Sequence, residues 1–324
     1  MLSIALVYSG AHASNVENQD TVIQRDEVAQ ALTQLGCRVE CFALGNSLDE
    51  LEHWLAKFDF DLVFNLVETF KDSDRNSYVL PALFQAHKLP YTGCSALSLA
   101  MTGSKLVQKK LLTMAGIPTA EYFLHTDTMA ASTTQWIVKS DTEHASIGLD
   151  ASSVVDSIEQ AIDKIKAMHG TLGGLWFAER YIEGREFNIA LLPSAEGECD
   201  ILPIAEMTFV GFADDQPKIV DFAAKWDSGS TVYHTTVRRF LCAQEEERLN
   251  ETLKTIALQC WQLFSLTGPA RVDIRVDELG NPWVLEVNAN PCLSADAGFM
   301  VAAQRAGLTH NAVIDRMIQR INLN

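Results

Sequence analysis

The sequence contains no apolar run that approaches the roughly 18 consecutive residues of a membrane-spanning helix. Positive charge is also scarce, since 25 lysines and arginines are set against 42 aspartates and glutamates, for a net charge of −17 at pH 7. Such a surface repels nucleic acid and anionic membranes except at a local basic pocket. We therefore expect neither a broad nucleic-acid interface nor binding to membranes.

Cysteine usage excludes two further kinds of site. The 7 cysteines are odd in number and show no CxxC pair and no His-rich partner spacing, so neither a disulfide framework nor a zinc site is expected. We expect reduced thiols in a cytoplasmic protein. The N-terminal LSIALVY faintly imitates a signal peptide, but it is short and lacks a basic start. A first buried strand that ends at Gly10 is the better interpretation.

The order of strand-like and helix-like segments indicates how the chain is divided. The first hundred residues alternate between the two, which is typical of βαβ units on a mainly parallel sheet. We predict three domains, over residues 1–95, 96–180 and 181–324. Further along, 236–266 supplies another helix, whereas 212–233 has no periodicity and predicts a mobile loop that acts as a lid.

The segment RVDIRVDELGNPWVLEVN predicts a hairpin of two strands with its turn at ELGN. This turn places Asp273 opposite Glu286 and Arg271 opposite Asn288. Because side chains alternate along a strand, all four share one face. The opposite face should line the core with Val272, Ile274, Leu285 and Val287.

Two carboxylates directly opposite one another repel, so a positive charge is expected between them. Asp273, Glu286 and Asn288 offer the hard oxygen atoms that suit Mg²⁺, which usually completes its octahedron with water and substrate phosphates. Zinc prefers His or Cys ligands, and a single cysteine is the one such residue nearby. The hairpin alone leaves an alternative open, in which Arg271 and Arg275 neutralise the carboxylates on a solvated sheet face.

Isolated lysines on three separate elements strengthen the magnesium interpretation. Lys105, Lys139 and Lys225 are compact positive charges, each able to neutralise a phosphate oxygen. A single lysine is more often a solvated surface residue. Lys139 differs, because it ends the apolar strand WIV and begins a loop of small residues. Together with a hard cation, these lysines predict a polyphosphate site.

At this point the residues resemble the ATP-grasp superfamily, and specifically the D-alanine–D-alanine ligase-like family. Six blocks match in order and with matching spacing: FNLVET, LPALFQAHKLPYTGCSALSLAMTGSKLVQKKLLTMAGIP, WIVKSDTEHASIG, AERYIEGREF, DFAAKWDSGS and ARVDIRVDELGNPWVLEVNANPCLS. The resemblance implies an α/β chain with the ATP-grasp fold, in which an N-terminal doubly wound parallel-sheet domain is followed by two α+β subdomains that enclose the nucleotide. It also implies a carboxylate–amine ligase that works through an acylphosphate.

The resemblance also implies roles for individual residues. Those matching ATP-binding positions are Lys105, Lys139, Glu179, Tyr181, Ile182 and Glu186; those matching catalytic positions are Arg271, Lys225 and Ser146; and those matching metal ligands are Asp273, Glu286 and Asn288. Without the motif context, Glu179 and Glu186 would be interpreted as ordinary exposed strand residues. The implied cofactors are ATP and Mg²⁺, with Mn²⁺ as a substitute, and a homodimer is expected by resemblance alone.

The amino-acid pockets depart from the family pattern. His12 stands near the place of a family glutamate, Cys292 replaces a glycine near the reacting carbonyl, and Ala297 replaces a serine that helps to hold the second substrate's carboxylate. We therefore expect amino-acid or peptide substrates other than two D-alanines. For Asp296 two interpretations stay open. It receives a cationic group of the substrate, or it complements the dipole of a helix that Ser294 caps.

Three classes of function are compatible with these residues. The leading hypothesis is an ATP- and Mg²⁺-dependent ligase that forms an amide or peptide bond, and D-alanine–D-alanine ligase itself is retained as an alternative. A non-catalytic protein that binds nucleotide or amino acid could have the same fold, although the intact metal-ligand positions argue against loss of catalysis. The third is a kinase that releases its acylphosphate or phosphorylates a small molecule.

Overall fold

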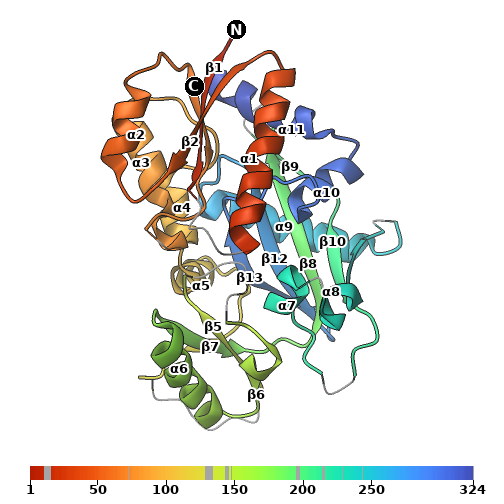
Figure 1. Ribbon diagram of the computed structural model, residues 1–324. Coiled ribbons are helices and arrows are strands. Elements are labelled where there is room, and N and C mark those ends of the chain that lie inside the picture. Colours follow the sequence, from red (N-terminus) through yellow and green to blue (C-terminus); the bar gives the residue numbers. More distant parts are fainter. Residues whose placement is uncertain are drawn as a thin grey trace.

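The computed structural model describes residues 1–10, 16–71, 73–127, 134–142, 146, 148–194, 198–213, 216–227, 229–242 and 244–323. The described helices are α1 (Val16–Gln34), α2 (Leu48–Leu55), α3 (Val79–Ala86), α4 (Ala96–Thr102), α5 (Lys105–Met114), α6 (Ile158–Leu172), α7 (Phe222–Trp226), α8 (Thr231–Thr235), α9 (Glu247–Leu263), α10 (Gly298–Arg305) and α11 (His310–Gln319), with short 3₁₀ helices η1 (Asp74–Tyr78), η2 (Ala151–Ser153) and η3 (Arg320–Leu323). Three sheets accompany them, and Figure 1 shows a parallel sheet at one end, a small sheet with α6 at the other and a large sheet between them.

The N-terminal sheet is parallel and has helices on both faces. Its strands, in spatial order, are β2 (Arg38–Leu44), β1 (Ser3–Ser9) and β3 (Leu62–Leu66). Because side chains alternate along β1, Ile4 and Leu6 pack in one core with α1, α10 and α11, whereas Ala5 and Val7 pack in another with α2 and α3. The parallel pairing and the two covered faces confirm the predicted doubly wound arrangement.

The small sheet is antiparallel and is covered by α6 on one face. Its strands, in spatial order, are β4 (Tyr122–Phe123), β7 (Trp176–Arg180), β5 (Trp136–Ser140) and β6 (Val154–Val155). Trp136 and Val138 pack against α6 in a buried cluster. Lys139 lies between these alternating positions and Ser140, so it points to the opposite face, away from α6.

The large sheet separates a deep core from the site. Its path is β11 (Thr236–Phe240), β10 (Ala205–Phe209), β8 (Gly184–Pro193), β12 (Ala270–Asp277) and β13 (Pro282–Asn288), and β9 (Cys199–Ile201) also pairs with β8. Phe187 and Ile189 of β8 are fully buried in one core with α9. The alternating residues Glu186 and Asn188 face the other way. Further along β8, Leu192 joins the core that contains β1, α10 and α11.

The predicted hairpin register is confirmed at the end of the hairpin that lies away from the turn. Asp273 pairs with Glu286 and Arg271 pairs with Asn288. A β-bulge then shifts the register, so that Ile274 pairs with Val284. The extra residue is Leu285, which was expected in the core but lines the cavity described below. A bulge breaks strict alternation, and the pattern of apolar residues does not signal it.

Two predictions of local structure were wrong. The first part of the helix expected over 236–266 is the strand β11, and the helix α9 begins at Glu247. The stretch 212–233, expected to lack structure, contains α7 and the start of α8. Each of these two helices has only five residues, too few to show a helical period.

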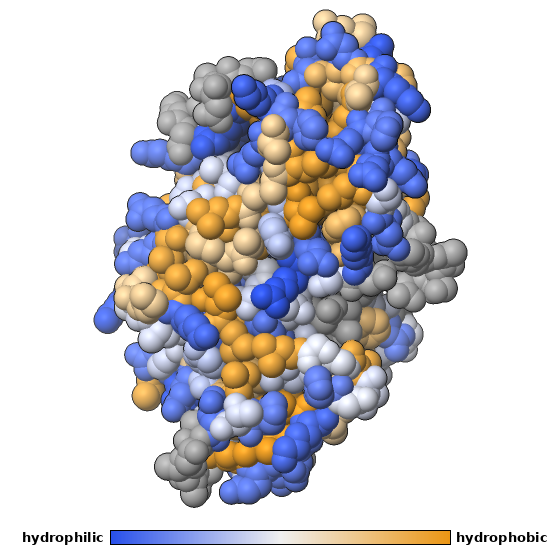
Figure 2. Space-filling view, turned by 90° about the vertical axis from the view of Figure 1, so that its left-hand side faces the viewer, coloured by the Kyte–Doolittle hydropathy of each residue, from blue (hydrophilic) through white to orange (hydrophobic). Residues whose placement is uncertain are grey.

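Large apolar side chains are exposed at scattered places, including Leu97, Met114 and Leu172. Figure 2 shows such apolar surface interrupted by polar groups on one face. This is ordinary for a folded chain. None of the helices in the described ranges is long and apolar enough to span a bilayer. All seven cysteines are free, as predicted.

Candidate active site

A cavity of about 610 Å³ opens between the small sheet and the large sheet. Its size falls within the roughly 300–1,000 Å³ of small-molecule sites. The predicted residues that line it are Lys105, Lys139, Ser146, Glu179, Tyr181, Ile182, Glu186, Lys225, Arg271, Asp273, Glu286, Cys292 and Asp296. Asn288 lines a smaller cavity of about 60 Å³ instead. His12 lies outside the described residues.

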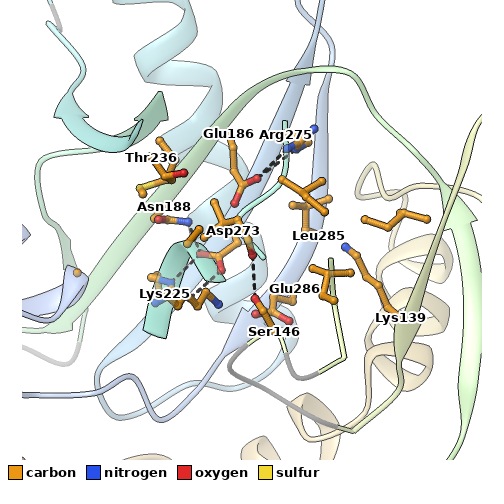
Figure 3. Close-up of a pocket in the computed structure, with 18 of the residues that line it drawn as sticks. Lys139, Ser146, Glu186, Asn188, Lys225, Thr236, Asp273, Arg275, Leu285 and Glu286 are labelled. Carbon is orange, nitrogen blue, oxygen red and sulfur yellow. Dashed lines mark hydrogen bonds and ion pairs between the residues drawn. The ribbon is translucent and has the colours of Figure 1, made fainter. Parts of the chain in front are cut away.

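One face of the large sheet forms a polar wall of the cavity. Alternation along β8 and β12 turns Glu186, Asn188, Arg271, Asp273 and Arg275 to this face. In Figure 3 Lys139 extends toward this wall from the small sheet, on the side of Leu285 and Glu286. The cavity therefore brings cationic groups of one sheet next to the carboxylates of the other.

Glu179 fixes two lysines on the small-sheet side. Its side chain is 1% exposed, and it forms ion pairs with Lys109 and with Lys139, whose Nζ lies 2.6 Å from Glu179 Oε1. Although burial opposes ionisation, the two lysines lower the pKa of Glu179 to about 2. Burial lowers the pKa of Lys109, whereas Glu179 outweighs burial at Lys139 and raises its pKa. Glu179 is thus buried and not the exposed strand residue of the alternative interpretation.

Lys109 was not among the predicted site residues, although its position in the sequence contains a signal. It follows Lys105 by four positions on α5, so both lysines lie on one helix face. That face is buried at both positions. The start of α5 is fixed by Asp141, which directly follows β5 and accepts hydrogen bonds from Ser104 Oγ at 2.8 Å and from the Leu106 amide at 2.8 Å. This contact holds Lys105 at the cavity.

Asp273 and Glu286 lie side by side at the end of the hairpin, and both have basic partners. Arg271 Nε and Nη2 donate to the two carboxylate oxygens of Asp273 at 2.7 and 2.8 Å, and Asn188 Nδ2 donates at 2.9 Å. Lys105 Nζ lies 3.4 Å from Glu286 Oε2. In this structure Arg271 therefore neutralises Asp273, as the alternative interpretation of the hairpin expected. Arg275, in contrast, pairs with Glu186.

The donor chemistry of this end fits a hard cation. Asp273 and Glu286 are directly paired on adjacent strands and together offer four carboxylate oxygens. Among the described residues no group of three or more His, Cys, Asp or Glu side chains has metal-binding geometry, and the predicted set contains only two such residues with one asparagine. Asn288 Oδ1 accepts a hydrogen bond from the Asn290 amide at 2.8 Å. A metal ion bound here would displace the Arg271 guanidinium from Asp273.

Lys225 reaches the cavity from the short helix α7. Asp221 caps this helix by accepting from the Ala224 amide at 2.8 Å. Burial and the nearby Arg271 lower the pKa of Lys225, while the carboxylates of Glu286 and Asp273 oppose that shift. Ser146, at φ +63°, donates from Oγ to the Val220 carbonyl at 2.8 Å and so connects its loop to the segment before α7. In Figure 3 Lys225 and Ser146 lie near Asp273 and Glu286.

Among the residues expected to contact adenine and ribose, Ile182 and Glu186 are buried beside Arg275, and Tyr181 is half-buried. Arg275 Nη2 donates to Glu186 Oε2 at 3.0 Å, and Nη1 donates to the Ile182 carbonyl at 2.7 Å. The Tyr181 amide donates to the Gln135 carbonyl at 2.8 Å, and Tyr181 Oη accepts from the Lys218 amide at 3.0 Å. These contacts hold the connection between the two sheets, and the predicted nucleotide contacts of Glu179, Tyr181, Ile182 and Glu186 stay predictions.

The opposite end of the cavity contains the residues that depart from the family pattern. Cys292 Sγ lies 3.4 Å from Asp20 Oδ2 and 3.2 Å from Ser294 Oγ. Burial raises the pKa of the Cys292 thiol. Ser294 was expected to cap the following helix, but its hydroxyl donates to Asp20, and α10 begins after Ala297 without a side-chain cap. Asp296 is exposed and precedes the first turn of α10.

The sequence prediction also missed Arg238 and Thr236 on β11. Both line this end of the cavity, and each has a buried polar atom without a hydrogen-bond partner among the described residues. They could not be found, because 236–266 was interpreted as a helix. Interpreted as a strand, TVRRF alternates and places both residues on one face.

With this geometry established, sequence comparison identifies the family. The model described as "D-ala D-ala ligase C-terminus" matches residues 107–319, more than half of the chain. The chain belongs to the D-alanine–D-alanine ligase family. It is therefore an ATP-grasp ligase, of the kind that forms carbon–nitrogen bonds, and the resemblance drawn from the six blocks is confirmed.

Individual relatives support the same family. A D-alanine–D-alanine ligase from Methylococcus capsulatus is 27% identical over 323 residues, covering 98% of this chain and 94% of that protein. The uncharacterized protein y4sG from Sinorhizobium fredii is 28% identical over 260 residues, covering 79% of this chain and 73% of that protein.

Solved structures agree on the fold. The D-alanine–D-alanine ligase from Bacillus anthracis complexed with ATP aligns with a TM-score of 0.77 at 18% identity, over 100% of this chain and 98% of that one. The D-alanine–D-alanine ligase from Coxiella burnetii aligns with a TM-score of 0.71 at 17% identity, over 100% and 96%. At these identities the alignments show the ATP-grasp fold, as predicted.

Proposed function

We propose that this chain uses ATP and Mg²⁺ to join the carboxylate of one amino acid to the amine of another, and that the pair is not two D-alanines. The strongest support is that Lys105, Lys139 and the paired carboxylates Asp273 and Glu286 all line the same cavity. Phosphoryl transfer requires positioning and neutralisation of charge more than covalent participation by the protein. The cavity offers both.

The reaction begins with transfer of the γ-phosphoryl group. An oxygen of the substrate carboxylate attacks the γ-phosphorus, and ADP leaves. Lys139 is held toward the cavity by Glu179, and Lys105 approaches from the start of α5, so both cations can neutralise phosphate oxygens without moving far. Bound magnesium, held by Asp273, Glu286 and Asn288, would supply further charge neutralisation on the phosphates.

The second step forms the amide bond. The amine nitrogen attacks the acyl carbon of the acylphosphate, the bond to the phosphate oxygen breaks, and inorganic phosphate leaves while the nitrogen loses a proton. Arg271 lies beside Asp273, where it can stabilise the charge that develops. Lys225 approaches from α7 and Ser146 from a neighbouring loop, and closure of these segments over the cavity would exclude water from the acylphosphate.

The amino-acid end supports substrates other than two D-alanines. Asp20, Cys292 and Asp296 bring two carboxylates and a thiol to the lining of the cavity. A methyl side chain makes no hydrogen bonds to these groups, whereas a polar or charged side chain can. A substrate with a polar or charged side chain suits this lining better.

Phosphate release from MgATP tests this function, with a panel of L- and D-amino acids offered singly and in pairs. Release that requires two amino acids, with mass spectrometry of the dipeptide, is expected. Release with one amino acid and no dipeptide product would instead indicate a kinase, and retained ATP binding without release would indicate a binding protein. Fastest turnover with D-alanine alone would overturn the proposed specificity.

A further inference from the structure

The side of the cavity formed by β11 and the start of α10 contains a cation with no assigned partner. Arg238 lines the cavity, and its Nε is buried without a hydrogen-bond partner among the described residues. Thr236, two positions earlier on the same strand face, has a buried Oγ1 in the same condition. Leaving a buried donor without a partner is destabilising. Both side chains line the cavity, where a ligand can supply the partner that these enclosed atoms lack.

The orientation of Arg238 follows from the register of the sheet. Arg238 pairs with Met207 of β10, and Met207 also lines the cavity. The neighbouring Arg239 pairs with Glu206 and points to the opposite face, where its Nη2 lies 2.7 Å from Glu206 Oε2. Adjacent arginines on one strand therefore differ: Arg239 has a carboxylate partner, whereas Arg238 has none within the part of the chain that the structure describes.

The start of α10 provides space for the guanidinium group. A Cβ atom built on Gly298 would lie 3.2 Å from Arg238 Nη2 and 3.7 Å from Arg238 Cζ. The distance to Nη2 is shorter than an ordinary van der Waals contact. Glycine at this position thus allows Arg238 to lie against the first turn of α10. The cap residue Ala297 makes no side-chain hydrogen bond to the helix. Both the cation and the uncapped helix end favour an anion in the cavity.

The charged neighbours of Arg238 place it at the amino-acid end and not at the triphosphate end. They are Arg271 and Asp296, and burial together with Arg271 lowers the pKa of Arg238 while Asp296 opposes that change. No ion pair joins Arg238 to Asp296 in the described ranges of the chain. The phosphate-facing Lys139 is instead influenced by Glu179, Glu286 and Glu186. Arg271 therefore lies between the two ends.

We propose that Arg238, with Thr236 beside it, binds a carboxylate group of the amine substrate. The inference rests on the ligase function proposed above. A guanidinium group binds a carboxylate through two parallel hydrogen bonds, and Thr236 Oγ1 adds a third donor. The amine substrate is then an amino acid or a peptide with a free carboxylate, and amines that lack this group are poor substrates. Arg238 acts as a specificity residue that positions the amine.

Arg238→Gln tests the inference, with Arg239→Gln as the matched control on the same strand. The probes are the amino acid that supports the fastest phosphate release as the amine substrate and its primary amide, which lacks the negative charge. We expect Arg238→Gln to raise the KM for this amino acid by about 10- to 100-fold, as loss of a charged hydrogen-bonded pair predicts, with a much smaller change in kcat and in the KM for ATP. Arg238→Lys should recover part of the loss.

A second measurement separates binding from a merely structural role. Wild-type protein should prefer the amino acid to its amide, and Arg238→Gln should remove that preference, whereas Arg239→Gln should retain it. Thr236→Val, a nearly isosteric change, should raise the KM for the amino acid by several-fold without changing the KM for its amide. An unchanged preference in both cavity variants would overturn the inference.

The two proposals fail in different ways. If wild-type protein releases phosphate with a single amino acid and forms no dipeptide from any pair, the ligase function itself is wrong. If wild-type protein is a two-substrate ligase but Arg238→Gln and Thr236→Val keep the wild-type KM for the amino acid, only the assignment of Arg238 is wrong. Equal losses of kcat and of thermal stability in both variants, with the preference for the carboxylate intact, would also overturn it.

Discussion

The two ends of the cavity differ in how their charges are partnered. At the triphosphate end Lys109 and Lys139 share Glu179, and Arg271 binds Asp273 through two hydrogen bonds. At the amino-acid end Arg238 and Thr236 each have a buried atom that finds no partner among the residues that the structure describes. The first arrangement holds its charged side chains in place before any ligand arrives. The second arrangement makes binding depend on the chemical groups of the ligand. Substitutions at the amino-acid end can therefore change substrate specificity without changing the groups proposed to bind the nucleotide.

The largest effect is expected at the metal end. Glu286→Gln keeps the shape of the side chain but removes a charge that the metal requires, and metal contributes several kcal/mol of charge stabilisation, equivalent to about 10³-fold or more in rate. Phosphate release should fall to background, while circular dichroism and the melting temperature stay close to wild type. The matched control is Glu251→Gln on α9, whose carboxylate pairs with Lys254 at the surface. Undiminished turnover in Glu286→Gln would refute the metal assignment.

The second effect is on stability and comes from Glu179. Glu179→Gln leaves Lys109, which is fully buried, without its counter-charge, and breaking a buried ion pair in this way costs about 3–5 kcal/mol. Urea unfolding monitored by fluorescence should show a loss of this size at pH 7. Glu206→Gln, which breaks pairs with the more exposed Arg185 and Arg239, should cost less.

The pH dependence of this loss provides a check on its cause. The pKa of Glu179 falls from an ordinary 4.5 to about 2 on folding. Its stabilisation is therefore complete above pH 4.5 and is lost as the pH falls toward 2. The difference in unfolding free energy between wild type and Glu179→Gln should be constant at neutral pH and shrink in acid. A difference that stays constant down to the acid limit of folding would contradict the ion-pair explanation.

A smaller effect, on turnover, is expected at the edge of the cavity. Lys225→Ala removes a cation expected to act on the γ-phosphate when its loop closes, so kcat should fall by about 10²-fold while the KM for ATP changes much less. Lys254→Ala, a surface lysine paired with Glu251, is the control and should turn over normally. Equal losses of kcat and of ATP affinity in Lys225→Ala would indicate a static phosphate ligand and not part of a lid.

The same contrast between the two ends explains what the sequence could predict. The triphosphate end depends on period-two alternation and on the register of one hairpin, so the pairing of Asp273 with Glu286 follows from the turn. The position of Leu285 did not follow, because the bulge inserts one residue without a mark in the pattern. Arg238 was missed because the five residues of β11 lie shortly before a long helical pattern and were merged with it. Lys109 was missed because its spacing from Lys105 shows only a shared helix face, whereas the burial of its charge becomes visible only when its partner, 70 residues away in sequence, is placed beside it.

The smallest effect would decide the role of Asp296. This exposed carboxylate is the acidic neighbour of Arg238 and competes with a substrate carboxylate for it. If Arg238 binds the carboxylate of the amine substrate, Asp296→Asn should lower the KM for that substrate by about two- to five-fold, the modest size expected for an exposed charge. If Asp296 itself receives a cationic group of the substrate, the same change should raise the KM. Because the two roles predict opposite signs, steady-state kinetics at low salt can separate them even when the change is small.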